Sequence, residues 1–273
     1  MNVIGVDIGG TKIAAGRVND RAEIFQSYTI PTRASEGFDV SIEQVWRAIE
    51  PLLSPEIEAI GICAPGPLDP RAGVIVNPPN LPGWRDVPLV KVAQDRFGLP
   101  VRLENDCNAA GLAEARFGAA RGFANVFYAA IGTGIGAGII LDGKIYHGKN
   151  AAAGEAGHMT IDYRSSTICG CGVPGCIEAL ASGRFTGDLE EHTVRLAAWL
   201  GGVVSLLDPD IVVLGGGVSE IGDPLFARLR AMIPKWTVNP YVKATPIVPA
   251  RFGTQAGVVG AAAVALADST MNL

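Results

Sequence analysis

Three of the five cysteines stand within eight positions, at Cys169, Cys171 and Cys176, and the residues between them include three glycines and a proline. A segment of this composition can fold tightly round an ion, and His158, eleven positions before the first cysteine, supplies a fourth ligand. A closed set of three thiolates and one imidazole is typical of a structural zinc site. Free cysteines placed together by chance, or a redox pair, are the alternatives that we weigh against it.

Two short segments rich in glycine and threonine could hold phosphate groups. Each is predicted to be the tip of a hairpin, because an apolar strand-like run stands on either side of it. Glycine has no Cβ, so backbone N–H groups there can point at phosphate oxygens, and threonine hydroxyls add donors. The residues of these tips are Gly9, Gly10, Thr11, Lys12, Gly132, Thr133 and Gly134. Either tip alone reads equally well as an ordinary tight turn, but two matching tips favour phosphate.

Two further features belong to this phosphate hypothesis. Asp7 precedes the first tip and could hold Mg²⁺ through water, since Mg²⁺ dehydrates reluctantly. Gly215, Gly216 and Gly217 follow an apolar run, where a flat glycine surface could admit an adenine ring or its ribose. A tight strand-to-helix turn is the alternative for these three glycines.

The segment Gly132–Ala137 also fits the loose fingerprint of a dinucleotide-binding fold. That motif requires a helix next, whereas residues 135–141 are β-branched, are broken by glycine and end at a hairpin signal. We therefore reject the dinucleotide-binding interpretation. The sequence also contains no Walker A lysine motif.

Asp106 comes shortly after a strand-like run, Val101–Glu104, and stands at the edge of the next predicted helix. It could accept the proton of an attacking hydroxyl, as a catalytic aspartate does in phosphoryl transfer. The helix dipole would then keep the carboxylate ionised and weakly basic. The alternative is a helix N-cap, a common role for aspartate.

Other polar residues stand in loops. The segment Asn77–Trp84 is too rich in proline for the interior of a helix or strand, and Glu155 and His158 are three positions apart. A polyol needs several oriented donors and acceptors, and these residue types supply them. Cys63 and Cys107 are predicted to be small core residues, and His147 and His192 to be surface residues without partners.

The strands and helices that must position these residues are predicted to occur in the same order in both halves of the chain. Apolar periodicity and turn residues predict an α/β fold with the order βββαβαβα in each half, and two such halves would face each other across a cleft. The first half is predicted to have strands at 2–8, 12–18, 22–30, 57–63 and 101–104 and helices near 42–53, 88–97 and 107–117. The second is predicted to have strands at 124–131, 135–141, 143–146, 211–214 and 245–248 and helices near 193–206, 223–233 and 255–268.

We expect two domains, at residues 1–117 and 118–254, with a C-terminal helix over about 255–273 that packs back on the first. The chain has 273 residues, of which 48% are hydrophobic and 18% charged, so it has the material for a packed core. Its formal charge is −5 and no block of basic residues occurs, which argues against nucleic acid as a partner. Apolar runs are too short for a membrane span, and no signal peptide precedes Asp7, so a cytoplasmic location is expected.

These segments together resemble the repressor, open-reading-frame and kinase (ROK) family of sugar kinases over nearly the whole chain. The segments that carry the resemblance are Asp7–Lys12, Ala64–Pro67, Asn80–Trp84, Glu104–Asp106, Gly132–Gly136, Glu155–His158, Cys169–Cys176 and Glu178.

The resemblance implies the actin-like ATPase (ribonuclease H-like) fold, a homodimer, and phosphorylation of a hexose at O6 with ATP, Mg²⁺ and a structural zinc ion. Because the chain resembles the bacterial glucokinases of the family, glucose is the expected substrate. His158 would bind zinc by one ring nitrogen and the sugar by the other. The residues implied to surround the sugar are Asn80, Asn105, Asp106, Glu155, His158 and Glu178, with Asp106 as the catalytic base.

The chain departs from the family between Glu178 and the helix predicted from Thr193, where Ala181–Glu191 is shorter than the family's sequence. This leaves the phosphoryl donor open between ATP and polyphosphate. N-acetylglucosamine and N-acetylmannosamine remain alternative substrates. A repressor of this family would need a helix-turn-helix before the first tip, where six residues precede Asp7, and a non-catalytic actin-like protein would not need the cysteine loop.

Overall fold

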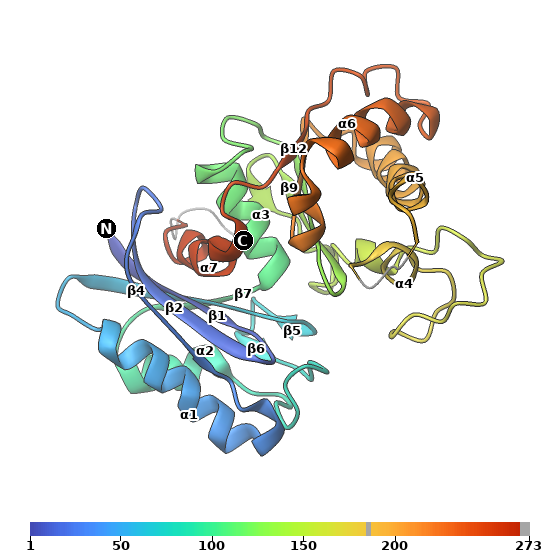
Figure 1. Ribbon diagram of the computed structural model, residues 1–273. Coiled ribbons are helices and arrows are strands. Elements are labelled where there is room, and N and C mark those ends of the chain that lie inside the picture. Colours follow the sequence, from blue (N-terminus) through green and yellow to red (C-terminus); the bar gives the residue numbers. More distant parts are fainter. Residues whose placement is uncertain (184–186, 268–273) are drawn as a thin grey trace.

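A computed structural model describes residues 1–183 and 187–267 and contains two five-stranded sheets (Figure 1). The strands of the first sheet, in spatial order, are β3 (Ile24–Pro31), β2 (Lys12–Asn19), β1 (Asn2–Ile8), β4 (Ile57–Ala64) and β7 (Val101–Asn105). Those of the second are β10 (Lys144–Ile145), β9 (Ile135–Leu141), β8 (Val126–Ile131), β11 (Ile211–Gly215) and β12 (Ile247–Pro249). In each sheet an antiparallel meander is extended by parallel strands, so the two halves share one topology.

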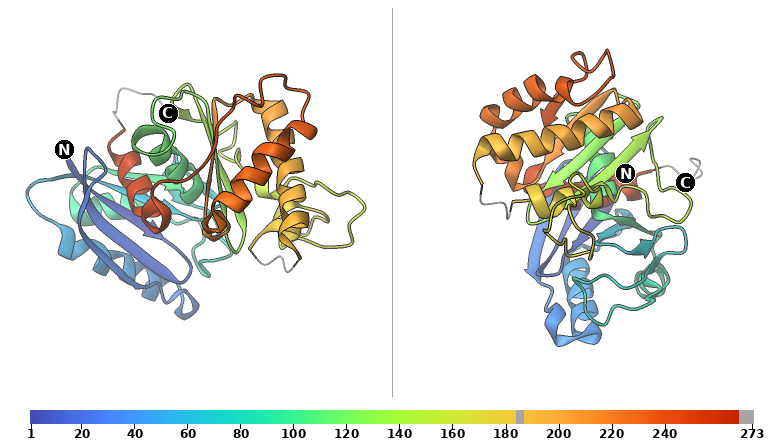
Figure 2. Two further views of the ribbon diagram at one scale, coloured as in Figure 1. Left: turned by 45° about the horizontal axis from the view of Figure 1, so that its top comes forward. Right: turned by 90° about the vertical axis from the view of Figure 1, so that its right-hand side faces the viewer.

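The helices form layers on and between the sheets (Figures 1 and 2). They are α1 (Phe38–Ile49), α2 (Leu89–Phe97), α3 (Asp106–Phe117), α4 (Ile177–Ala181), α5 (Leu189–Leu207), α6 (Asp223–Met232) and α7 (Ala256–Ala265). Helices α1 and α2 cover the outer face of the first sheet, and α5 and α6 lie on the outer side of the second. Helices α3 and α7 pack against each other between the sheets.

Helix α7 is apolar all round, with the sequence AGVVGAAAVA, and a helix of this kind must be buried on every side. It packs on β1 and β4, although it is the last described element of the chain. Glycine in the sheet allows this close approach: a Cβ on Gly5 would lie 2.1 Å from the carbonyl oxygen of Val258, and one on Gly61 would lie 1.8 Å from that of Ala261. The glycine-rich composition is therefore partly a packing requirement.

We expect Gly61→Ala to destabilise the protein by about 1–3 kcal/mol or more, because its methyl group would overlap the backbone of α7. A matched control is Gly202→Ala in α5, where a Cβ would meet no other atom of the described residues within 4 Å. That change should stabilise the helix by about 0.5–1 kcal/mol. Thermal unfolding of both variants tests the prediction, and equal melting temperatures would contradict it.

The predicted order of strands and helices agrees with the structure, with differences at several edges. The short antiparallel pair β5 (Leu68–Asp69) and β6 (Val74–Ile75), and helix α4, were not predicted. Helix α5 begins at Leu189 rather than near Thr193, because Asp188 caps it by accepting the N–H of Glu191 at 2.7 Å. The first turn of α5 is polar, so apolar periodicity does not indicate that the helix begins there.

Two other strands and the last helix also differ from the prediction. Strand β10 has two residues instead of the four predicted, and β12 begins at Ile247 rather than at 245. Helix α7 ends at Ala265, and the predicted continuation into residues 268–273 lies outside the described residues. The domain boundary at residue 117 stays a prediction. Within residues 1–183 and 187–267, no helix combines the length and apolarity needed to cross a membrane.

Candidate active site

A cavity of about 720 Å³ lies between the two halves and takes its lining from both. This volume is in the range of small-molecule sites. The six residues that the sequence suggested for a polyol all line it: Asn80, Asn105, Asp106, Glu155, His158 and Glu178. They come from a loop before α2, the junction of β7 and α3, the loop after β10 and the start of α4. Folding therefore brings together polar groups that are up to 98 positions apart in the sequence.

The junction of β7 and α3 orients two of these side chains. Asn105 is the N-cap, since its Oδ1 accepts the N–H groups of Cys107 at 2.9 Å and Asn108 at 3.2 Å. Asp106 is the first helical residue, and its Oδ1 accepts the N–H of Cys107 at 2.8 Å. The capping role that we weighed for Asp106 thus belongs to Asn105, and the Asp106 carboxylate faces the cavity.

The pKa of Asp106 is raised to about 6, mainly by burial and then by the negative charge of Asp7, although hydrogen bonds from Cys107 act to lower it. The expectation of a weakly basic carboxylate is therefore wrong, because desolvation outweighs the helix N-terminus. The pKa of Asp7 is raised as well, mainly by burial, while the Cys63 thiol and the charge of Lys12 lower it. Two desolvated carboxylates that repel each other form a suitable environment for a divalent cation.

Both glycine tips are hairpin turns, as predicted. In the first, the N–H of Gly9 donates to the oxygen of Lys12 at 2.9 Å, and a Cβ on Gly10 would lie 2.7 Å from the oxygen of Asn80. In the second, the N–H of Gly132 donates to the oxygen of Gly134 at 2.9 Å. Of the residues of the two tips, Gly134 alone is in the lining of the cavity. The first tip lies behind that lining and packs on Asn80, which belongs to it.

The remaining residues predicted for a nucleotide lie outside the lining of this cavity. Gly216, between β11 and the next turn, packs on the end of β8, where a Cβ would lie 2.5 Å from the oxygen of Ile131. The three glycines at 215–217 therefore stand beside the second tip, at the carboxyl ends of two parallel strands. Ligands of open α/β sheets commonly bind at this edge.

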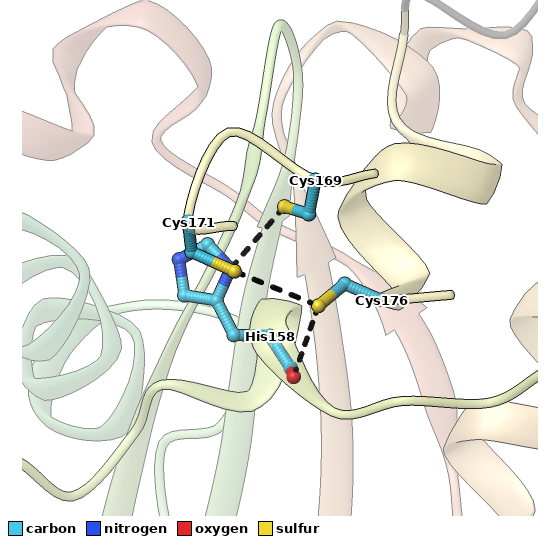
Figure 3. A group of neighbouring side chains, drawn as sticks. All are labelled: His158, Cys169, Cys171 and Cys176. Carbon is cyan, nitrogen blue, oxygen red and sulfur yellow. Dashed lines mark hydrogen bonds between the residues drawn. The ribbon is translucent and has the colours of Figure 1, made fainter. Parts of the chain in front are cut away.

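His158, Cys169, Cys171 and Cys176 form one cluster, and their ligand atoms all lie within 4.8 Å of one another (Figure 3). The Cys169 sulfur is 3.6 Å from Nδ1 of His158, and the sulfurs of Cys171 and Cys176 are 3.7 Å apart. Tetrahedral zinc with Zn–S bonds of about 2.3 Å separates two sulfur ligands by roughly 3.8 Å. The donor set and its spacing therefore fit zinc.

Glu178 connects this cluster to the second tip. Its Oε2 accepts the N–H of Ile135 at 2.8 Å, and its Oε1 lies 3.6 Å from the sulfur of Cys169. The sequence suggested only a sugar contact for this residue. Its position in the first turn of α4 makes it a brace between the cysteine loop and the turn at Gly134 as well.

Three further predictions about individual residues are wrong. His147 and His192 are buried, with 5% and 7% of their surface exposed, and each has a partner: Glu104 for His147 and the oxygen of Ala181 for His192. Cys107 is partly exposed and lines the cavity, whereas Cys63 is a core residue as expected. Asn108 was not predicted from the sequence, although it lines the cavity and its Nδ2 donates to Glu104 at 3.0 Å. Glu104 lies in a strand and Asn108 in a helix, so the spacing rule for side chains on one helix gives no signal for this pair.

The chain matches the model of the ROK family over residues 3–187 and 185–268. The two matched pieces meet at residues 185–187, within the segment Ala181–Glu191 that is shorter than the corresponding sequence of the family. The chain is 33% identical to the glucokinase of Streptomyces coelicolor over 310 aligned positions, covering 96% of each protein. It is also 32% identical to the N-acetylmannosamine kinase of Citrobacter koseri, covering 98% of this chain and all of that protein.

Solved structures agree with this match. A ROK hexokinase from Thermus thermophilus superposes with a TM-score of 0.84 at 36% identity, covering 97% of this chain and 98% of that one. A ROK glucokinase from Streptomyces griseus, in complex with glucose and AMPPNP, gives 0.83 at 31% identity over 97% and 99%. An inorganic polyphosphate/ATP-glucomannokinase from Arthrobacter gives 0.71 at 31% identity over 96% of each chain. These likenesses confirm the actin-like ATPase fold.

Proposed function

Since the chain belongs to the ROK family and is a sugar kinase, we propose that it transfers the terminal phosphoryl group of ATP to O6 of glucose. The observation that carries this proposal is that one cavity gathers six polar side chains next to Gly134 of the second tip and next to Asn80, on which the first tip packs. Glucokinases among the relatives support glucose, and the neighbour solved with glucose and AMPPNP supports ATP. A transcriptional repressor is the poorer fit, because it has no need of a desolvated aspartate in such a cavity.

In this proposal the polar side chains orient the sugar, and Asp106 accepts the proton of the 6-hydroxyl as it attacks the outermost phosphorus. Its raised pKa makes it a better proton acceptor than an ordinary carboxylate, while it is still ionised at neutral pH. Most of the rate enhancement would come from holding the hydroxyl in line with the phosphoryl group, since little covalent chemistry is left to the protein.

The two tips would bind the phosphates through backbone N–H groups and the hydroxyls of Thr11 and Thr133. Gly215–Gly217 would lie against the nucleoside. Asp7, with Asp106 close by, would hold Mg²⁺, which neutralises charge on the phosphates. Zinc in the cysteine cluster would fix the ring of His158 at the wall of the cavity.

A coupled assay tests the substrate and the donor together. Glucose, N-acetylglucosamine and N-acetylmannosamine would each be offered with ATP and with inorganic polyphosphate. We expect the highest kcat/KM with glucose and ATP. The N-acetylmannosamine kinase relative and the polyphosphate-using neighbour make the other combinations the specific competitors. Failure of every sugar with every donor would overturn the proposed function, whereas activity with another pair would revise only the sugar or the phosphoryl donor.

The pH profile provides a further prediction. Asp106 acts as a base only when it is ionised, and its pKa is raised to about 6. We therefore expect kcat/KM to be constant above this pKa and to fall about tenfold per pH unit below it. Circular dichroism at each pH verifies that the enzyme stays folded. A profile that stays flat down to pH 5 would exclude Asp106 as the base.

A further inference from the structure

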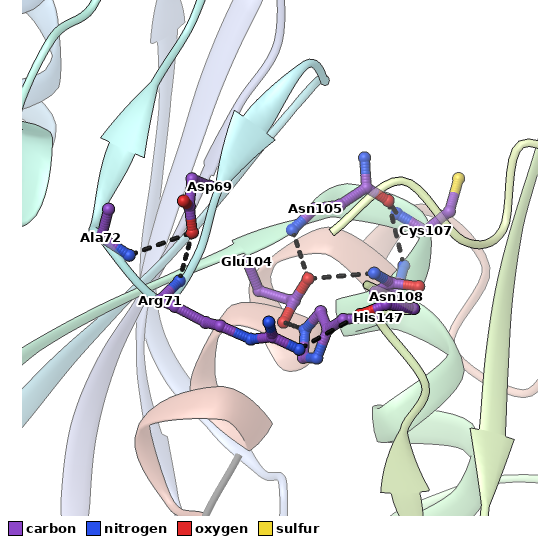
Figure 4. Close-up of polar contacts among 9 residues, drawn as sticks. Asp69, Arg71, Ala72, Glu104, Asn105, Cys107, Asn108 and His147 are labelled. Atoms are coloured by element: carbon purple, nitrogen blue, oxygen red, sulfur yellow. Dashed lines mark hydrogen bonds and ion pairs between the residues drawn. The ribbon is translucent and has the colours of Figure 1, made fainter. Parts of the chain in front are cut away.

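Glu104, the residue before Asn105 in β7, has a carboxylate with three partners from three segments (Figure 4). Its Oε1 accepts the N–H of Asn105 at 2.8 Å and Nδ2 of Asn108 at 3.0 Å. Its Oε2 lies 2.7 Å from Nε2 of His147. The side chains of Glu104 and His147 are only 2% and 4% exposed, so solvent does not compete for these contacts.

His147 belongs to the other half of the molecule, in the loop that follows β10. The same loop is tied to the first half a second time, because the guanidinium of Arg71 donates to the oxygens of Gly148 at 3.2 Å and Lys149 at 3.4 Å. Residues 150–155, which follow directly, form one wall of the cavity. The loop therefore joins a fixed point on the first half to the wall that carries Glu155.

The Glu104 end of the contact with His147 lies next to the candidate base, Asp106. The N–H of Asn105 is held by Glu104, and the Asn105 side chain caps the turn on which Asp106 stands. The Asn108 amide nitrogen donates to Glu104, although its buried Oδ1 has no partner among residues 1–183 and 187–267. A movement of the Glu104 carboxylate would thus carry the first turn of α3 with it.

We propose that Glu104 and His147 are positioning residues for the phosphoryl transfer, whose buried pair fixes Asp106 relative to the wall of Glu155 across the cleft. Neither side chain takes part in the transfer of the proton or of the phosphoryl group. The pair acts through Asn105 on one side and through the loop 147–153 on the other. A displacement of about 1 Å between a base and a bound hydroxyl lowers turnover by about 100-fold, so small shifts of this pair have large effects.

The test compares two substitutions of His147. His147→Leu removes the contact to Oε2 of the buried Glu104 carboxylate and leaves the two hydrogen bonds to Oε1. We expect kcat to fall about 10–100-fold while the KM for ATP changes less than about twofold. His147→Gln keeps an N–H donor and should retain kcat within about threefold. Because the pair acts as a unit, adding Glu104→Gln to His147→Leu should lower kcat little further.

A matched control separates positioning from stability. Glu114 is a fully buried carboxylate in α3, the helix that carries Asp106. It lies away from the cavity and accepts the N–H groups of Ala119, Arg251 and Phe252. Glu114→Gln should lower the melting temperature and leave kcat unchanged. An equal loss of kcat in this control, an unchanged kcat in His147→Leu, or a His147→Gln enzyme as poor as His147→Leu would each overturn the inference.

The inference rests on the proposed function for its kinetic readout, so a second measurement is independent of activity. Hydrogen exchange of the free protein should show faster exchange in residues 147–155 and in the first turn of α3 for His147→Leu than for the wild type. Inactivity of the wild type with all sugars would refute the proposed function alone. Unchanged exchange in His147→Leu would refute the positioning role, whatever the substrate is.

Discussion

Asp106→Asn is expected to lower kcat by about 10²–10⁴-fold while leaving the KM for the sugar nearly unchanged, because the amide can bind a hydroxyl but cannot take its proton. Asparagine has the same shape, and its Oδ1 can still accept the N–H of Cys107, so the first turn of α3 should remain in place. Steady-state kinetics with saturating ATP, together with sugar binding by calorimetry, separate the two effects.

Asp210→Asn is the control for this change. Asp210 also accepts backbone N–H groups, from Ala124 and Asn125, but it lies outside the cavity. We expect its kcat to equal that of the wild type. An Asp106→Asn enzyme with a kcat near the wild-type value would remove Asp106 from the mechanism, and the desolvation of this carboxylate would then need another explanation.

The second large effect is expected from Cys171→Ser. Zinc content should fall from about one ion per chain to a small fraction, and kcat/KM for the sugar should fall by about 10–100-fold. The reason is that His158 and Glu178 both contact Cys169 in the cluster and both line the cavity. Cys171 is exposed, so its replacement disturbs little except the ligand set.

Metal analysis of freshly purified protein measures the first part of this prediction, and kinetics the second. Val173→Ser changes an exposed side chain of the same loop without removing a ligand, and it should keep both metal and activity. Absence of zinc from the wild-type protein would contradict the assignment of the metal. A Cys171→Ser enzyme that has lost zinc and keeps its kcat/KM would show that the cluster does not support the sugar site.

Much of the fold was predictable because its signals are local. The hairpins at Gly9–Lys12 and Gly132–Gly134 follow from turn chemistry, and the repeated order of elements predicted two similar sheets. The spacing of the cysteines predicted a cluster that the folded chain assembles. Each of these features depends on residues that are close together in the sequence.

What could not be predicted depends on contacts between distant segments. His147 looked like a surface residue because its partner, Glu104, is 43 positions away and belongs to the other half. The pKa of Asp106 depends on burial under loops whose shapes no local pattern encodes. The brace made by Glu178 was missed for the same reason, since Ile135 is also 43 positions away.

The placement of α7 has a consequence for synthesis of the chain. A ribosome completes β1 and β4 long before it reaches α7, the helix that covers their inner face, because all the strands of the second sheet lie between them in the sequence. Until then Val3, Val18 and Ala59 remain uncovered, so the first sheet cannot mature while the rest is being translated. The first half can therefore complete its folding only after the second half has been synthesised. A fragment that stops after α3 should aggregate rather than fold.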